Sequence, residues 1–417
     1  MKKTPLDKWI HKTTGGDIPE YQLKKLCDTL KTAQNGTYYR GLYPEKIADT
    51  AMIENLPMID AKTLQENGSG LVCVTQSDIS RIVTLFTSGS TGQPKRVYFT
   101  QDDQELTLDY FANGLAGVVA PGGAMAILLP CESPGGVGDL IAQALERIPV
   151  KPVRHGPVGS LIDCAAELDN NNTNSIVGAP VQVLALARYC EARGINLNIT
   201  SVLLCTDSIP RTVRREIGRI WKCEVYEHYG TTEMGLGGAI DCDAHDGYHI
   251  RENDLLFEIV DESGKPLPDG SPGEIVFTTL TRRGMPLIRY KTGDISKIIP
   301  GKCKCGSLVK RVAPISGRLG GGVTMECGTR LLINDFDETL LGIKEVCDFR
   351  LTASPESNIL KIDIDTQQSL GHVSSDEIED VLRGSGLIHG LTTEISVNNH
   401  PDTLVSRTGK RVIIKNT

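Results

Sequence analysis

A nine-residue run of small hydroxyl residues, glycines and a terminal lysine is the segment of this sequence best suited to chemistry. The run, Thr87-Ser88-Gly89-Ser90-Thr91-Gly92-Gln93-Pro94-Lys95, lies between two β-type runs, Ile82–Phe86 and Val97–Thr100, and the first of these is predicted to be a buried strand. Backbone N–H groups and hydroxyls in such a loop suit phosphate oxygens, and Lys95 adds a positive charge. An ordinary turn needs only about four such residues. We therefore predict a phosphate-binding loop, which is not a Walker loop because the G-x-x-x-x-G-K-[ST] pattern is absent.

Two further segments carry side chains that suit a nucleotide. Tyr229-Gly230-Thr231-Thr232-Glu233 follows a predicted strand, and Arg289-Tyr290-Lys291-Thr292-Gly293-Asp294 follows predicted antiparallel strands. A tyrosine ring can face an adenine, a threonine hydroxyl can bind the α-phosphate, and a glutamate is a hard ligand for Mg²⁺. An aspartate can accept hydrogen bonds from both ribose hydroxyls. Either segment alone could be an ordinary exposed loop.

The three segments resemble, in type and order, the signatures of the adenylate-forming superfamily, which includes acyl-CoA synthetases, peptide-synthetase adenylation domains and luciferases. The short stretch before the phosphate loop is similar to that of the phenylacetate-CoA ligase branch. The resemblance implies ATP, Mg²⁺ and coenzyme A as cofactors and assigns Thr232 and Glu233 to catalysis, with Glu233 on Mg²⁺. It implies the following contacts to ATP or AMP: Thr87, Ser88, Gly89, Ser90, Thr91, Gly92, Lys95, Asp207, Ser208, His228, Tyr229, Gly230, Thr231, Thr232, Asp294 and Arg318.

The end of the sequence resembles the terminal Gly-Lys signature of the same superfamily. Ser406-Arg407-Thr408-Gly409-Lys410-Arg411 contains it, and the resemblance makes Lys410 the catalytic lysine that serves adenylation. A cation delivered to the site would stabilise charge that moves onto pyrophosphate. Arg318 is followed by Leu319-Gly320-Gly321-Gly322, a predicted hinge. Relatives usually carry a charged residue directly after that arginine, so this departure leaves the thioester step open.

Cysteines and a histidine predict a second site. Cys303-Lys304-Cys305-Gly306 places two thiolates on one tight turn, and Cys242 and His249 flank another turn-like segment. Three sulfurs and one nitrogen form a Cys₃His set, which structural zinc prefers. His245 is a competing nitrogen ligand, and buried free cysteines are the alternative interpretation. Phenylacetate-CoA ligase-like proteins often carry similar residues here, which favours zinc.

Composition limits the partners. The chain has 417 residues, 40% of them hydrophobic and 23% charged, with a net charge of −8 and twelve cysteines. We expect no nucleic-acid partner, because no basic block is present. We expect no membrane span, because the longest apolar stretch, 114–131, is broken by Pro121-Gly122-Gly123. The start of the sequence lacks the apolar core of a signal peptide. Scattered cysteines then indicate reduced thiols and a cytoplasmic protein. A homodimer is left open.

The pattern of elements predicts an α/β fold. Strands alternate with helices from 100 to about 230, which predicts a largely parallel sheet covered on both faces. Short strands at Leu255–Val260 and Glu274–Thr279 predict a small antiparallel barrel or sheet. The last hundred residues predict a small α+β domain. We expect an N-terminal domain over 1–316, with the nucleotide, acyl and zinc sites, and a mobile C-terminal domain over 317–417.

The predicted function is ATP-dependent activation of a small-molecule carboxylate to an acyl-adenylate, followed by transfer to a thiol. Coenzyme A is the expected acceptor. One alternative is an adenylating enzyme that transfers the acyl group to an amine, a hydroxyl or a carrier protein. Another is a zinc-stabilised nucleotide-binding scaffold without turnover. The acyl pocket is expected around 130–138, 178–180 and 234–238, and the sequence does not identify the acid.

Overall fold

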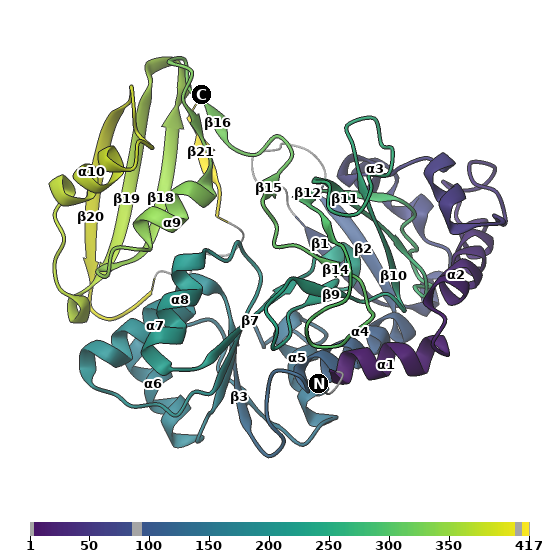
Figure 1. The fold of residues 1–417 in the computed structure, drawn as a ribbon, viewed down its shortest axis with the longest axis horizontal. Helices are drawn as coiled ribbons and strands as arrows, with labels where there is room; N and C mark the ends of the chain where they lie inside the picture. The colour runs from purple at the N-terminus through teal and green to yellow at the C-terminus, as the bar shows by residue number, and fades with distance from the viewer. Residues whose placement is uncertain (1–3, 86–93, 405–410, 417) are drawn as a thin grey trace. The chain divides into compact units, whose positions relative to one another are not determined.

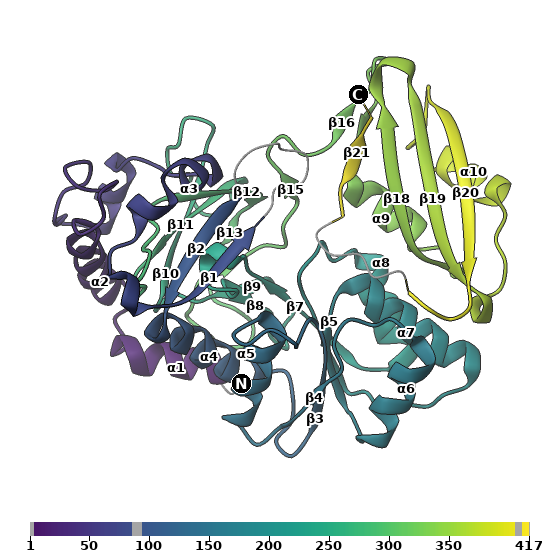
Figure 2. The same ribbon diagram turned by 180° about the vertical axis from the view of Figure 1, so that it is seen from behind.

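The computed structural model describes residues 4–85, 94–404 and 411–416, which fall into two compact units (Figures 1 and 2). The first unit comprises residues 1–120, 143–148 and 228–319. The second comprises residues 121–142, 149–227 and 320–417. The predicted phosphate-loop residues Thr87, Ser88, Gly89, Ser90, Thr91 and Gly92, and the predicted catalytic Lys410, lie outside the described residues.

An antiparallel sheet carries part of the candidate site in the first unit. Its strands are β10 (Leu255–Val260), β11 (Gly273–Thr279), β12 (Tyr290–Ser296) and β15 (Gly317–Arg318), paired in this order. Their inward side chains, such as Phe277 and Ile275, are buried in the main hydrophobic core of this unit. The predicted antiparallel element is therefore present, as a four-stranded sheet.

Helices and short strands complete the first unit. The helices are α1 (Pro5–Thr14), α2 (Ile18–Ala33), α3 (Ala61–Asn67) and α4 (Gln101–Leu115); the short strands are β8 (Ala239–Ile240), β9 (Tyr248–Ile250), β13 (Ile298–Ile299) and β14 (Arg311–Val312). At the start of α4, the Thr100 side chain accepts a hydrogen bond from the Asp103 amide, and Asp103 accepts one from the Thr100 amide. This capping box satisfies two backbone donors and fixes where α4 begins.

The strand predicted before the phosphate loop exists, but the expectation that it is buried was wrong. β1 (Ile79–Leu85) forms a two-stranded antiparallel ribbon with β2 (Lys95–Thr100), and its side chains alternate between half-buried and exposed. β1 pairs with no other described strand. A ribbon with one covered face produces this alternation, because successive side chains point to opposite faces. The pairing of Leu85 with Lys95 places Lys95 at the start of β2.

A parallel sheet forms one layer of the second unit. Its strands β4 (Lys151–Arg154), β3 (Ala124–Leu128), β5 (Ser175–Gly178), β6 (Ser201–Leu204) and β7 (Glu224–Tyr229) pair side by side and parallel. The connecting helices are α5 (Val137–Glu146), α6 (Leu161–Asn170), α7 (Pro180–Arg193) and α8 (Arg211–Trp221). α7 begins with a proline and ends at Gly194 in the left-handed conformation, the usual arrangement at helix ends.

Residues 320–417 form an α+β layer of the second unit. The sheet order is β20 (Thr392–His400), β19 (Ile359–Gln367), β18 (Val346–Ser354) and β21 (Ile413–Lys415). α9 (Ile333–Leu340), α10 (Ser375–Gly384) and a ribbon of β16 (Val323–Thr324) and β17 (Arg330–Leu331) complete the layer. One hydrophobic core joins this layer to α7 and α8; it includes Leu184, Phe336 and Leu351.

The predicted fold class is confirmed, and most element positions agree. Ser201–Leu204 and Leu255–Val260 are strands with the predicted bounds. The sequence analysis missed β4 and α6. The chain passes from the first unit to the second between Leu319 and Gly320, which is within the predicted hinge. Residues 320–417 belong to the same compact unit as residues 149–227. The predicted domain boundary at 316 stays a prediction.

No helix among the described residues is long and apolar enough to cross a membrane.

Candidate active site

A buried ion pair joins two of the predicted nucleotide-binding segments. Lys95 Nζ contacts Glu233 Oε1, and the two side chains are 17% and 5% exposed. Lys95 lies at the start of β2, and Glu233 lies in the short 3-10 helix Thr232–Met234. Burial acts to raise the pKa of Glu233, but the Lys95 charge and the hydrogen bonds to the carboxylate together outweigh burial, so the pKa of Glu233 is lower than usual. The carboxylate is therefore held ionised, as a metal ligand must be.

Residues that the sequence analysis did not select fix the position of Glu233. Tyr290 donates its hydroxyl hydrogen to Glu233 Oε1 at 3.2 Å, and Arg282 donates to the Glu233 carbonyl oxygen at 2.7 Å. The Arg282 side chain also covers the ring of Phe99, at 4.9 Å from its centre. Burial lowers the pKa of Arg282 to about 10, so this guanidinium stays charged at neutral pH.

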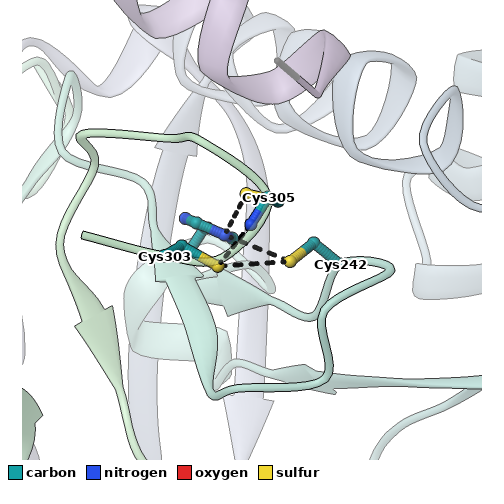
Figure 3. Close-up of side chains that lie close together, drawn as sticks. Cys242, Cys303 and Cys305 are labelled. Carbon is teal, nitrogen blue, oxygen red and sulfur yellow. Dashed lines mark hydrogen bonds between the residues drawn. The ribbon is translucent and has the colours of Figure 1, made fainter. Parts of the chain in front are cut away.

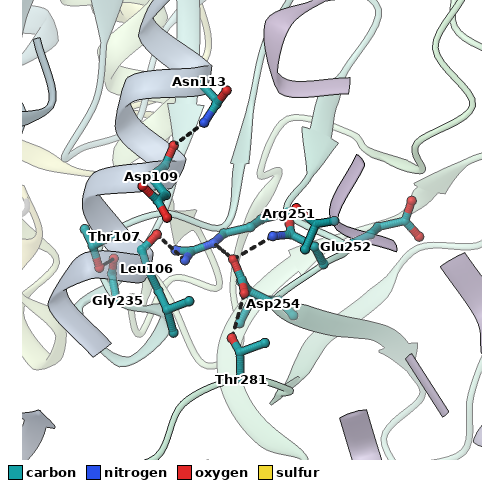
Figure 4. A network of polar contacts seen from close by, with 12 residues as sticks. Leu106, Thr107, Asp109, Asn113, Gly235, Arg251, Glu252, Asp254 and Thr281 are labelled. Carbon is teal, nitrogen blue, oxygen red and sulfur yellow. Dashed lines mark hydrogen bonds and ion pairs between the residues drawn. The ribbon is translucent and has the colours of Figure 1, made fainter. Parts of the chain in front are cut away.

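A second set of polar contacts ties α4 to the segment after Glu233 (Figure 4). Thr107 on α4 donates to the Gly235 carbonyl oxygen at 3.0 Å. Arg251 donates to the Leu106 carbonyl oxygen and to Asp254, whose other oxygen accepts from Thr281 at 2.6 Å. Buried groups linked in this way resist movement, because each lost bond leaves an unsatisfied polar atom.

Asp294 lies in a β-bulge that the Thr-Gly-Asp sequence produces. Val276 of β11 pairs with Lys291, and Glu274 pairs with Ile295, so a step of two residues faces a step of four in β12. Gly293 takes a φ of 76°, which glycine adopts readily. Such a bulge redirects a side chain out of the regular alternation.

The bulge places Asp294 between Tyr229 and Arg318. The Tyr229 hydroxyl donates to Asp294 Oδ2 at 2.9 Å, and Arg318 Nε lies 2.9 Å from Asp294 Oδ1. Tyr229 is 6% exposed and its ring packs edge-on against Phe257. Two links connect the Lys95–Glu233 pair with the Asp294–Arg318 pair. Tyr290, which contacts Glu233, shares β12 with Asp294. Tyr229, which contacts Asp294, lies four residues before Glu233.

Glycines allow the segment around Glu233 to pack closely. A Cβ added at Gly230 would lie 2.3 Å from the Leu236 carbonyl oxygen. One added at Gly237 would lie 2.1 Å from the ring of Tyr110. Within the 234–238 segment, which we expected to line the acyl pocket, position 237 therefore has no room for a side chain.

The remaining predicted contacts are placed as follows. His228 packs 5.9 Å from the Tyr110 ring and 6.2 Å from the Phe111 ring, and burial lowers its pKa to about 4. Thr231 accepts from the Met234 amide at 3.3 Å, and Thr232 is half-buried. Asp207 and Ser208 belong to the second unit, where Asp207 Oδ1 accepts from the Ser208 amide at 2.8 Å.

The predicted zinc ligands form a compact cluster in the first unit (Figure 3). The ligand atoms of Cys242, His249, Cys303 and Cys305 all lie within 4.8 Å of one another, and all four residues are buried. The Cys242–Cys303 sulfur distance is 3.7 Å, and His249 Nε2 lies 3.3 and 3.4 Å from the sulfurs of Cys242 and Cys305.

His249, and not His245, completes this cluster. His245 pairs instead with Asp241, at 2.6 Å between Nδ1 and Oδ2. A tetrahedral zinc site with usual bond lengths has S–S edges of about 3.8 Å and S–N edges of about 3.5 Å. The observed distances therefore fit such a site.

The sequence of this chain matches the family of AMP-binding enzymes over residues 42–280. This match covers more than half of the chain, so the chain belongs to that family. The predicted membership of the adenylate-forming class, and its enzymatic nature, are confirmed.

The curated relatives agree with the branch that the sequence resembles. The phenylacetate-coenzyme A ligase of Pseudomonas putida is 27% identical over 355 residues, which cover 79% of this chain and 77% of the relative. The enzyme of the same name from Escherichia coli strain K12 is 28% identical over 341 residues, covering 76% and 75%. Among solved structures, a 2-hydroxyisobutyryl-CoA ligase in the postadenylation state has a TM-score of 0.80 at 19% identity, covering 95% of this chain and 89% of that one. This last similarity supports the fold.

Proposed function

We propose that this protein activates a small carboxylic acid with ATP and transfers the acyl group to coenzyme A. The observation that carries the proposal is the arrangement of Lys95, Glu233, Asp294 and Arg318, from four distant segments, in two ion pairs that Tyr290 and Tyr229 connect. In the first half-reaction a carboxylate oxygen forms a bond to the α-phosphorus of ATP, and pyrophosphate leaves. In the second, the thiolate of coenzyme A attacks the acyl carbon, and AMP leaves.

Each residue of the site has a role that its contacts suit. Asp294 would accept the ribose hydroxyls, with Tyr229 and Arg318 orienting its carboxylate. Glu233 would bind Mg²⁺, whose preference for hard oxygen ligands the ionised, fixed carboxylate meets. Mg²⁺, when bound, would offset the negative charge of the phosphates. Lys95 would leave Glu233 and pair with a phosphate, so the ion pair holds both side chains ready before ATP binds.

Three other predicted roles complete the proposal. The hydroxyls and amides of 87–92 would bind the phosphates, Thr232 the α-phosphate, and Lys410 would serve adenylation only. Residues 317–417 would rotate about the Arg318–Gly322 hinge between the half-reactions. In support, Gly320 and Gly322 take φ values of 67° and 90°, and the chain passes from one compact unit to the other between Leu319 and Gly320.

Exchange of labelled pyrophosphate into ATP tests the first half-reaction. We expect exchange that depends on a carboxylic acid and is lost in Asp294→Ala; Lys62→Ala, an exposed lysine outside the site, is the matched surface control. A panel of carboxylic acids that includes phenylacetate, assayed by pyrophosphate release, would identify the substrate. Absence of exchange with every acid would refute the proposal and favour a scaffold.

A different acyl acceptor is the second candidate. A D-alanine--D-alanyl carrier protein ligase of Listeria welshimeri is 26% identical over 253 residues, covering 56% of this chain and 48% of the relative. Wild-type enzyme that exchanges pyrophosphate but forms no thioester with coenzyme A would favour a carrier protein, an amine or a hydroxyl as acceptor.

We further propose that Cys242, His249, Cys303 and Cys305 hold one structural zinc ion. The cluster joins segments about sixty residues apart, which the ion would crosslink. No residue of the nucleotide site belongs to it. Elemental analysis should find one zinc per chain, and cobalt substitution should produce thiolate–cobalt absorption. A zinc-free protein of unchanged stability would refute this proposal.

A further inference from the structure

Residues 320–417 are docked on α7 and α8 by polar contacts within the second unit. Arg188 on α7, 2% exposed, donates to the carbonyl oxygens of Leu341, Ile343 and Val346 at 2.8 to 2.9 Å. Glu338 on α9 accepts from the first two amides of α8, those of Arg211 and Thr212, at 2.6 and 3.0 Å. Both contacts join backbone to side chain, and the Glu338 contact lies directly after the predicted nucleotide turn, at the start of α8.

Arg411 makes a different connection. Its side chain is 10% exposed, and its Nε lies 3.1 Å from Asp207 Oδ2. Its Nη1 lies 2.8 Å from Asp337 Oδ1 on α9 and 4.0 Å from Asp348 Oδ1 on β18. The guanidinium also lies over the Phe349 ring, 5.4 Å from its centre. One arginine therefore holds carboxylates from the docked layer and from the turn after β6.

The turn that contains Asp207 needs outside support. Thr206 takes a φ of 75°, a conformation that is strongly disfavoured for a β-branched residue. Such strain persists only where surrounding contacts fix it, and it is concentrated at binding sites. One Asp207 oxygen accepts from the Ser208 amide within the turn, and the other pairs with Arg411. Among the described residues, Arg411 is the one cation in an ion pair with Asp207.

Arg411 is the cation that three carboxylates share, those of Asp207, Asp337 and Asp348. Removal of Arg411 would leave Asp207, Asp337 and Asp348 close together without their shared counter-charge, which opposes docking.

We propose that Arg411 is a positioning residue for adenylation, which fixes the Asp207 turn when residues 320–417 are docked. The inference rests on the proposed adenylating function. It predicts that Arg411 acts on one half-reaction, because a thioester formed after residues 320–417 have rotated no longer needs this contact.

The test compares Arg411→Gln, Arg411→Lys and the control Arg193→Gln. Arg193 also links α7 to the docked layer, through Asp402 at 2.7 Å, but it is 50% exposed and does not contact the Asp207 turn. Pyrophosphate exchange would be measured against ATP concentration, and thioester formation would be measured from supplied acyl-adenylate and coenzyme A. Thermal unfolding would show whether each variant is folded.

We expect Arg411→Gln to slow pyrophosphate exchange on the order of 10²-fold, the effect of a small misplacement of reacting groups. The KM for ATP should rise, and thioester formation should be nearly unchanged. Arg411→Lys keeps the charge but loses the several N–H donors of the guanidinium, so its exchange rate should lie between those of Arg411→Gln and the wild type. Arg193→Gln should resemble wild type.

Two results would overturn the inference while leaving the proposed function intact. In one, Arg411→Gln exchanges pyrophosphate as fast as wild type. In the other, both half-reactions fall equally together with the unfolding temperature, which indicates a purely structural role. Absence of exchange in the wild-type enzyme would instead overturn the proposed function and this inference together.

Discussion

The Lys95–Glu233 ion pair permits a quantitative test of the ligand-free site. Lys95→Met removes the cation and leaves the Glu233 carboxylate, 5% exposed, without a counter-charge. Breaking a buried pair in this way costs about 3 to 5 kcal/mol. Because Tyr290 still donates to Glu233 Oε1, we expect a loss near the lower end, about 3 kcal/mol. The double variant Lys95→Met/Glu233→Gln should regain most of this loss, since neither charge remains.

The pH dependence of the unfolding free energy provides a second test of the same ion pair. In the wild type the pKa of Glu233 is lowered, so the stability it contributes is present above the unfolded pKa and is lost as pH falls. In Lys95→Met, burial dominates and should raise this pKa. The variant should therefore be least stable at neutral and higher pH, and its deficit should shrink toward pH 5.

Urea unfolding of the ligand-free variants at several pH values measures both effects. Lys62→Met, which removes a 74% exposed lysine paired with Glu66 at 3.8 Å, is the surface control and should change little. The reasoning fails if Lys95→Met is as stable as this control, or if the double variant is no more stable than Lys95→Met.

Three further predictions concern other parts of the chain. Cys305→Ser should lower the unfolding temperature and release zinc, whereas Cys223→Ser, a half-buried cysteine outside the cluster, should retain zinc; equal zinc content would contradict the proposed ligand set. Asp294→Asn should raise the KM for ATP about tenfold or more, the effect of about 1.4 kcal/mol in a charge-assisted hydrogen bond, without changing the KM for coenzyme A. For Asp337, burial raises the pKa to about 7, against the lowering effect of Arg411, while Asp207, Asp348 and Glu338 raise it. Its stability contribution is thus present below the unfolded pKa of about 4 and is lost progressively as pH rises to the folded pKa of about 7. Asp337→Asn should therefore flatten the decline of the unfolding temperature between about pH 4 and 7, and an unchanged decline would contradict this assignment.

The signatures were predictable from sequence because their chemistry is local. Gly293 and Asp294 are adjacent residues, so the segment that carries the proposed ribose carboxylate was recognisable in the sequence, although the bulge that presents it was not predicted. The Cys303–Cys305 pair was recognisable for the same reason. The choice between His245 and His249 was not, because it depends on strand β9 and its pairing with β14, which brings His249 opposite Arg311.

The supporting residues could not be predicted because nothing local distinguishes them. Arg282 donates to a carbonyl oxygen forty-nine positions away, and Arg188 holds three carbonyl oxygens more than 150 positions away. From the sequence alone, neither arginine can be distinguished from an ordinary surface cation. The burial predicted for β1 failed for a related reason: the strand has an apolar composition, but the ribbon leaves one of its faces uncovered.

The contact between Tyr110 and Gly237 constrains how the sequence of the 234–238 segment, the predicted wall of the acyl pocket, can change. The Tyr110 ring occupies the space that any side chain at position 237 would need, and the ring is itself fully buried. A single substitution at either position therefore creates a clash or a cavity, and both outcomes are destabilising. Variants with a reshaped segment should consequently carry paired changes, with a smaller residue at 110 whenever 237 is enlarged. A library that randomises the two positions together would sample folded enzymes that neither single-site library contains.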